Sequence, residues 1–235
     1  MARQALYMTA FHRIIANVRS ALERKPLPAV NHREPAHEAV PIAPGARRAE
    51  LTSQFARELE RVSGHFMGVL APAELPERIA ALARELKITS AAFGASTNIN
   101  LEPAARALER AGASVIRAHE ATDGERAAVR QRIAGCDLGI VEADYAIAST
   151  GTFAVLGGPG RPNSLTLLPP ANLIVVDADR ILPDLAAMVD AIGSETIRTH
   201  RLALITGPSR TADIEKMIVL GVHGPKQLYA AAISR

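Results

Sequence analysis

The sequence predicts an α/β protein in which an open, mostly parallel sheet follows an N-terminal helix and arm. Short apolar runs alternate with longer amphipathic segments between Ala46 and Ile116, and this alternation is typical of parallel strands joined by crossover helices. Aliphatic side chains must fill the core, because 48% of the 235 residues are hydrophobic but only 3% are aromatic. A chain of this length fits one main domain with an appendage.

The first 45 residues form the appendage. Residues 1–24 place apolar side chains at helical spacing and predict an amphipathic helix. Such a helix needs a partner surface, which its own domain, a second copy in a homo-oligomer or another protein can supply. Residues 25–45 are rich in proline and predict an extended arm. The α/β domain is therefore expected to span residues 46–235.

Three helix–strand units open this domain. We expect helices over residues 46–61, 75–86 and 102–110, and strands over residues 66–70, 90–94 and 114–116. Residues 122–125 follow the capping-box pattern and predict a further helix that ends at Gly135. Together these units make one half of an open α/β sheet.

The second half changes in character. Residues 137–156 predict two strands joined by a turn at Thr150 and Gly151. We expect further strands over residues 164–168 and 173–177, a helix that Asp184 opens and Gly193 ends, and a strand over residues 202–205 that is covered on both faces. A helix that starts at residues 209–211 and stops at Gly221, and a strand that ends near Ile233, complete the domain.

The start of the last predicted helix is the first candidate ligand site. Ser209, Arg210 and Thr211 follow a turn at Gly207, and Gly224 lies in the turn after the helix. The first N–H groups of a helix lack intrahelical partners and attract anions. A guanidinium holds a carboxylate or a phosphate with two hydrogen bonds. This segment is therefore expected to bind a small anionic ligand.

Asp213, Glu215 and His223 are the candidate catalytic residues beside this site. Each can orient a substrate or transfer a proton, but sequence spacing alone assigns none of them an acid or base role. The alternative is structural, because acidic residues in the first turns complement a helix dipole and a histidine after a helix can cap its C-terminus.

Two further polar segments are candidates for the same site. The ligand-binding candidates there are Thr150, Gly151 and Thr152 in the strand–turn–strand unit, and Gly158, Gly160 and Arg161 in the loop that follows it. The loop lacks the lysine and hydroxyl of a P-loop, so it does not by itself predict a nucleotide site. Ligands collect at the carboxyl ends of strands in open α/β sheets, so we expect the three segments to converge.

Charge and cysteine content exclude several classes of protein. The 27 basic and 24 acidic residues are interspersed and leave a net charge of +3, which does not favour a nucleic-acid-binding protein. Cys136 is the single cysteine, so the sequence predicts no disulfide, metal site or iron–sulfur cluster in this chain, and Cys136 is expected to be a small buried residue. Without an apolar signal or membrane-spanning run, the protein is expected to be soluble and cytoplasmic.

The strings EADYAIASTGT, GPGRP with LLPP after it, and above all TGPSRTADIE followed by VLGVHGP resemble the LUD domain family, the YkgG-like or lactate utilization protein C group. The resemblance covers roughly residue 47 to the last residue. It implies a three-layer α/β/α sandwich similar to the NagB/RpiA/CoA-transferase-like fold. It also implies a role in oxidising L-lactate to pyruvate beside partner subunits that carry the iron–sulfur clusters, and Cys136 alone agrees with that division.

Ser149 departs from the family pattern, in which an acidic residue often stands before the Thr-Gly-Thr turn. A serine without a nearby base cannot act as the glutamate nucleophile of the distantly similar CoA transferases, so acyl-CoA transfer is disfavoured. Two alternatives to the lactate role stay open. One is a non-enzymatic assembly or regulatory protein that docks a partner through residues 1–45. The other is a stand-alone enzyme on phosphorylated sugars, folates or CoA esters.

Overall fold

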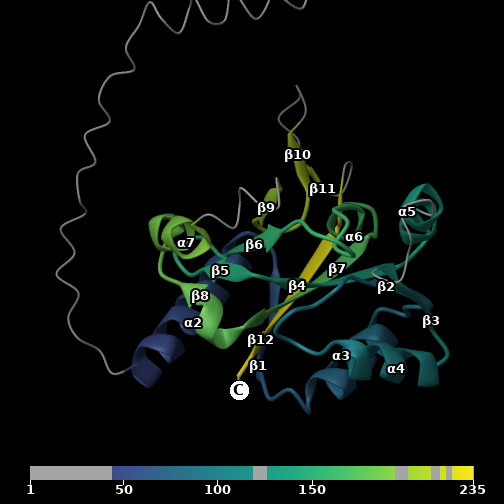
Figure 1. The fold of residues 1–235 in the computed structure, drawn as a ribbon, viewed down its shortest axis with the longest axis horizontal. Coiled ribbons are helices and arrows are strands. Elements are labelled where there is room, and N and C mark those ends of the chain that lie inside the picture. The colour runs from purple at the N-terminus through teal and green to yellow at the C-terminus, as the bar shows by residue number, and fades with distance from the viewer. Residues whose placement is uncertain (1–43, 119–125, 194–200, 213–217, 221–223, 235) are drawn as a thin grey trace, which may run out of the picture. The chain divides into compact units, whose positions relative to one another are not determined.

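Six parallel strands form the central sheet of the domain, in the order β1-β12-β7-β4-β2-β3 (Figure 1). The computed structural model describes residues 44–118, 126–193, 201–212, 218–220 and 224–234. The strands of this sheet are β1 (His65–Leu70), β2 (Ser90–Phe93), β3 (Ser114–Arg117), β4 (Leu138–Ala143), β7 (Ala171–Asp177) and β12 (Gln227–Ile233). All residues of β4 and β7 are buried, as expected for central parallel strands that are covered on both faces.

Helices cover both faces of this sheet and complete an α/β architecture. The helices are α2 (Pro44–Arg61), α3 (Leu75–Glu85), α4 (Glu102–Arg110), α5 (Arg126–Ala134), α6 (Ser164–Leu167) and α7 (Leu185–Ile192). Helices α3 and α4 lie on one face and α2, α5 and α6 on the other (Figure 1), and their apolar side chains belong to the two separate core clusters on these faces. The predicted α/β fold class with a mostly parallel sheet is therefore confirmed.

A second, smaller sheet lies on the face that carries α2. Its order is β8-β5-β6-β9, and its strands are β5 (Tyr145–Ile147), β6 (Thr152–Leu156), β8 (Ile181–Leu182) and β9 (Leu202–Ile205). A short 3-10 helix, η3 (Ala178–Arg180), precedes β8. Met188 and Ile192 of α7 are buried against this sheet, and the Asp184 side chain caps α7 by accepting from Ala187 N.

Helices α2, α3 and α4 end in the same backbone motif. The residue after each C-cap is left-handed: Ser63 (φ 67°), Lys87 (φ 55°) and Gly112 (φ 88°). The next residue donates back to the helix, as in Ile88 N to Ala83 O at 2.8 Å after α3, which is the Schellman motif. Glycine is the usual residue there because a side chain strains the left-handed backbone. Of these three helices, only α4 is followed by a glycine at this position.

Two predicted strands differ from the structure, one in its type and one in its environment. Residues 164–168 contain the short helix α6 where a strand is expected. Leu165 O accepts from Asn172 Nδ2 and lies where a side chain on Gly139 would overlap it, so contacts with β4 and β7 set this conformation. Strand β9 forms as expected, but it lies at the edge of the small mixed sheet with Leu204 49% exposed, and it is therefore not covered on both faces.

Several predictions concern residues outside the described ranges. The N-terminal helix, nearly all of the proline-rich arm and the capping box at residues 122–125 are among them. Helix α5 follows that capping box, and its Ile133 is fully buried as expected. Helix α2 begins at Pro44, two positions before the predicted start.

Asp137 joins the amino ends of β2 and β4. Its Oδ2 atom accepts from the backbone N–H and the hydroxyl of both Thr89 and Ser90, at 2.8 to 3.0 Å. Burial opposes ionisation, but these hydrogen bonds outweigh it and lower the pKa of Asp137 below its ordinary value.

This pKa predicts an acid-sensitive contribution to stability. Because the folded pKa lies below the unfolded value of about 3.9, the carboxylate stabilises the fold above that value, and the stabilisation is lost as the pH falls through the folded pKa. The difference in unfolding free energy between wild type and Asp137→Asn should therefore narrow between about pH 5 and pH 2. Urea unfolding across this range tests it, with the exposed Asp190→Asn as control. A constant Asp137→Asn difference would contradict the prediction.

Candidate functional site

The sheet has a topological switch point between its neighbouring strands β2 and β4. The chain leaves β2 toward α4 on one face, and leaves β4 toward the small sheet on the other face. The two connections therefore diverge at the carboxyl ends of two adjacent strands. Ligands of open α/β sheets characteristically bind at such a point.

A buried carboxylate bridges the switch point in this protein. Glu142, near the end of β4, is 2% exposed. Its Oε2 accepts from Thr97 N at 2.6 Å, and its Oε1 accepts from Asn98 N at 2.9 Å and from Asn98 Nδ2 at 2.8 Å. Three hydrogen-bond donors of the loop that follows β2 thus stabilise the buried carboxylate. Glu142 holds this loop against β4.

Arg161, a predicted ligand-binding residue, makes an internal ion pair beside this bridge. Its Nη1 and Nη2 donate to the two carboxylate oxygens of Asp144 at 2.8 and 2.9 Å, and Nη2 also donates to Glu142 O at 2.7 Å. Both side chains are mostly buried, and Asp144 also accepts from Leu156 N. The guanidinium therefore fixes the loop after β6 to the end of β4.

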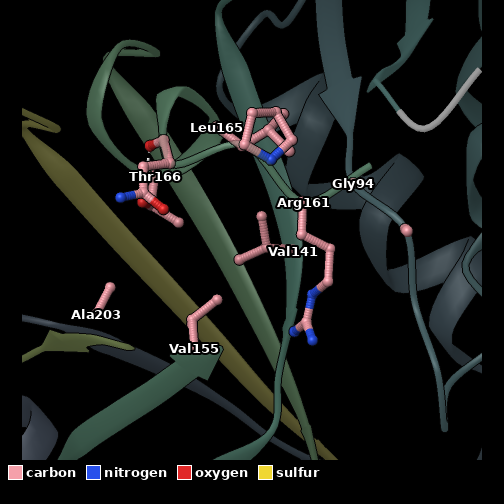
Figure 2. Close-up of a pocket in the computed structure, with 10 residues that line it drawn as sticks. Gly94, Val141, Val155, Arg161, Leu165, Thr166 and Ala203 are labelled. Carbon is pink, nitrogen blue, oxygen red and sulfur yellow. Dashed lines mark hydrogen bonds between the residues drawn. The ribbon is translucent and has the colours of Figure 1, made fainter. Parts of the chain in front are cut away.

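The loop of Gly158 and Gly160 completes this corner of the structure. Gly160 O accepts from Ala95 N at 2.9 Å, and Gly158 O accepts from Arg161 N at 3.1 Å. A cavity of about 10 Å³ lies underneath. Figure 2 shows Gly94, Val141, Val155, Arg161, Leu165 and Ala203 in its wall. This volume accommodates about one water molecule, so the switch point is filled by the protein itself.

A chain of three hydroxyls lies at the opposite end of β6. Thr152 Oγ1 is 2.8 Å from Thr150 Oγ1 and 2.7 Å from Thr206 Oγ1. We call Thr150, Thr152 and Thr206 the hydroxyl cluster. Two hydrogen bonds use two of its three protons, so one O–H is left to donate to a further acceptor. Thr150 and Thr206 are exposed at its two ends, whereas Thr152 is buried.

Two glycines with a left-handed backbone let the turns beside the hydroxyl cluster pack closely on the C-terminal end of α2. Gly151 has φ 62°, and a β-carbon there would come within 2.6 Å of Leu59 Cα. Gly207 has φ 77°, and a β-carbon there would come within 2.5 Å of Val62 O. Both predicted ligand-binding glycines therefore have a packing role, since only glycine allows this approach of the backbones.

Arg210 lies at the same end of α2, but it does not begin a helix. Residues Arg210–Ala212 form β10, which pairs antiparallel with β11 (Ile218–Leu220), so the predicted helix start at Ser209, Arg210 and Thr211 is wrong. The prediction of an anion site at a helix N-terminus is corrected with it. Arg210 Nη2 donates to Ser63 Oγ at 2.7 Å, close to the carbonyl end of α2, where a helix dipole favours a cation.

Ser209 and Gly224 lie next to each other beside this hairpin. Ser209 N donates to Pro225 O at 2.9 Å, and a β-carbon on Gly224 would come within 2.9 Å of Ser209 Cβ. The structure thus brings together two of the three predicted polar segments around residues 58–63. The segment 158–161 lies at the other end of β6. Because β6 has five residues, the two ends are about 15 Å apart.

The other residues singled out from the sequence are Asp213, Glu215, His223, Ser149 and Cys136. Asp213, Glu215 and His223 lie outside the described residues, so their roles stay predictions. Ser149 N donates to Pro183 O at 3.0 Å, and Ser149 is exposed. Cys136 is buried as predicted, and burial raises the pKa of its thiol.

Three polar residues that take part in these contacts were not singled out from the sequence. Thr206 completes the hydroxyl cluster, and Thr97 and Asn98 bind Glu142 across 44 or 45 positions. No local pattern marks such contacts, although Thr206 directly follows β9, and a polar residue at a strand end is a usable signal. Among the described residues, no group of three or more His, Cys, Asp or Glu side chains is placed to hold a metal ion.

The part of the chain that the structure describes has no helix with the length and apolar character needed to cross a bilayer.

Several curated proteins with sequence similarity are named lactate utilization protein C. The chain is 34% identical over 108 residues to "Lactate utilization protein C" of Halalkalibacterium halodurans, a match that covers 44% of this chain and 46% of the relative. It is 35% identical over 92 residues to "Uncharacterized protein YkgG" of Escherichia coli, covering 37% and 40%. Each match thus spans less than half of the relative's length.

A solved structure shares the fold. The crystal structure of a DUF162 family protein from Deinococcus radiodurans superposes with a TM-score of 0.59 at 23% sequence identity, and the match covers 82% of this chain and 99% of that chain. At this identity the likeness concerns the fold alone. The profile of the LUD domain matches residues 52–231. More than half of the sequence is included, and the chain belongs to the LUD domain family.

Proposed function

We propose that this chain is a lactate-utilisation subunit that assists the oxidation of L-lactate to pyruvate together with iron–sulfur partner proteins. The observation that carries the proposal is its similarity to proteins named lactate utilization protein C, at 34% identity in Halalkalibacterium halodurans and 31% in a Geobacillus species. Membership of the LUD family over residues 52–231 supports it.

The cysteine content supports the division of labour. An iron–sulfur cluster is held by several thiolates, and the 235 residues contain a single cysteine. Cys136 is 3% exposed and its thiol has a raised pKa, which disfavours the thiolate form that ligates metals. In this proposal the electrons from lactate therefore pass to clusters in the partner proteins.

The reconstituted system tests this function. The purified chain is mixed with the iron–sulfur proteins encoded beside it, L-lactate and an electron-accepting dye. Lactate-dependent dye reduction is expected to require this chain. Equal rates with and without the chain would contradict the proposal.

The proposal includes a small carboxylate or phosphate ligand at the end of α2. Arg210 supplies the positive charge there, and the hydroxyl cluster has one O–H left to donate. Both groups border residues 58–63, and Thr150, Thr206 and Arg210 are all exposed. A carboxylate can accept from the guanidinium and from a hydroxyl together.

Arg210→Ala is expected to abolish stabilisation by that ligand. A ligand at about 100 times its dissociation constant adds roughly 2.7 kcal/mol to the folded state, which raises the melting temperature by about 5 °C or more in a domain of this size. The melting temperature is measured with L-lactate, pyruvate and phosphate. Arg84→Ala is the control, because Arg84 lies in α3 on the opposite face of the central sheet from α2. The ligand should raise its melting temperature as much as that of the wild type. An equal shift in Arg210→Ala would argue against this site.

A further inference from the structure

An open groove lies at the amino edge of the central sheet, at the opposite end of the strands from the switch point. It has a volume of about 560 Å³, which is within the range of small-molecule sites. Asp137, Ala171 and Gln227 stand at the starts of β4, β7 and β12, three strands that lie side by side (Figure 1). The other wall is the segment after α3. We call this hollow the amino-edge groove.

The wall of the groove combines apolar and cationic groups. Its lining residues are Leu86, Lys87, Ile88, Asp137, Pro170, Ala171, Lys226 and Gln227. Leu86, Ile88 and Pro170 give it an apolar surface, and the two lysines add positive charge. A ligand that suits this wall has an apolar body and an anionic group.

Lys87 keeps its side chain at a position that favours glycine. It has φ 55° in the Schellman motif after α3, whereas the equivalent residue after α4 is Gly112. At the third such position, after α2, Ser63 accepts a hydrogen bond from Arg210. A strained residue persists where its surroundings or its function require it. Lys87 has no such partner among the described residues, but it lines the groove.

The charges in the groove leave the two lysines available. Asp137 is the one carboxylate in the lining, and its Oδ2 accepts the four hydrogen bonds from Thr89 and Ser90. With Lys87 and Lys226 the lining therefore has a net positive charge. Within the described ranges, neither Lys87 nor Lys226 forms an ion pair, and both are exposed. Two ammonium groups without carboxylate partners favour an anion between them.

We propose that the amino-edge groove binds a small organic anion, whose phosphate or carboxylate contacts Lys87 and Lys226 and whose carbon body packs on Leu86, Ile88 and Pro170. The site is separate from the residues around the end of α2 and does not rest on the proposed function. Its ligand differs from a free inorganic anion because Leu86, Ile88 and Pro170 also contact an apolar body.

Calorimetric titration with phenyl phosphate tests the site in the full chain. Lys87→Gly and Lys226→Ala are each expected to weaken binding about tenfold, the order of one charge-assisted contact. Lys87→Gly should at the same time raise the melting temperature by about 2–4 °C, because glycine relieves the left-handed strain. A variant that is more stable and binds less cannot owe its loss of binding to unfolding.

Three comparisons decide the outcome. Arg84→Ala removes an exposed cation of α3 that does not line the groove, and it should bind phenyl phosphate as the wild type does. Benzoate should bind and inorganic phosphate should bind more weakly than phenyl phosphate. The proposal is overturned if phenyl phosphate shows no binding at millimolar concentration, if Lys87→Gly binds it like the wild type, or if inorganic phosphate binds equally well.

Discussion

Replacing Gly151 by alanine is expected to destabilise the domain by about 3 kcal/mol or more. A residue with a side chain costs roughly 1–2 kcal/mol in the left-handed region, and Gly151 has φ 62°. Overpacking adds about 1–3 kcal/mol, because the new β-carbon would come within 2.6 Å of Leu59 Cα in α2. Backbone atoms of a helix cannot turn aside as a side chain can, so the turn must separate from α2.

Gly112→Ala is the matched control for this change. Gly112 is also left-handed, with φ 88°, but a β-carbon there meets no atom within 4 Å. It should therefore show only the conformational contribution, roughly 1–2 kcal/mol. Urea unfolding of both variants measures the difference. Equal losses of stability would show that Gly151 does not pack on α2 as described.

Replacing Glu142 by alanine is expected to cost about 2–4 kcal/mol, because hydrogen bonds to a charged group contribute roughly 1.5–3 kcal/mol each and water can replace part of them at the exposed Thr97. The change removes the acceptor of Thr97 N, Asn98 N and Asn98 Nδ2. The loop after β2 should then detach from β4. Hydrogen exchange at the Thr97 and Asn98 amides is expected to accelerate together with the loss of stability.

Glu142→Gln separates charge from hydrogen bonding. The amide keeps one oxygen acceptor in nearly the same volume but replaces the other with a donor that faces Thr97 N. It should be less harmful than alanine, yet still weaken protection of the Thr97 amide. Wild-type exchange in both variants would contradict a role of Glu142 in holding the loop.

The regular elements of the central sheet were predictable because local pattern and tertiary environment agree. Helix α4 begins and ends at the predicted residues: Ala104, Ala105 and Leu108 are buried on one stripe and Gly112 terminates it. The segment after Ser209 shows the opposite case. Its apolar spacing fits a helix, but pairing between Arg210 and Leu220 places both in a hairpin, and a pairing partner has no mark in a window of ten residues.

The candidate site was predictable in its residues but not in its grouping. Thr150, Thr152 and Arg210 were recognisable as polar side chains beside turns, and the structure places them around one helix end. Arg161 looks equally suited to an anion in the sequence, yet its guanidinium is already bound to Asp144. Whether an arginine is free or paired depends on contacts across the fold, which sequence spacing does not contain.

The position of β12 makes folding of this domain depend on its last strand. β12 lies between β1 and β7, and Tyr229 pairs with His65 from the start of the domain. Contacts between distant parts of a chain form slowly because a long loop must close first. Until β12 is synthesised and inserted, β1 has no neighbour and β7 presents an open edge, and such edges promote aggregation. A nascent chain that ends before Gln227 is therefore expected to need protection from a chaperone.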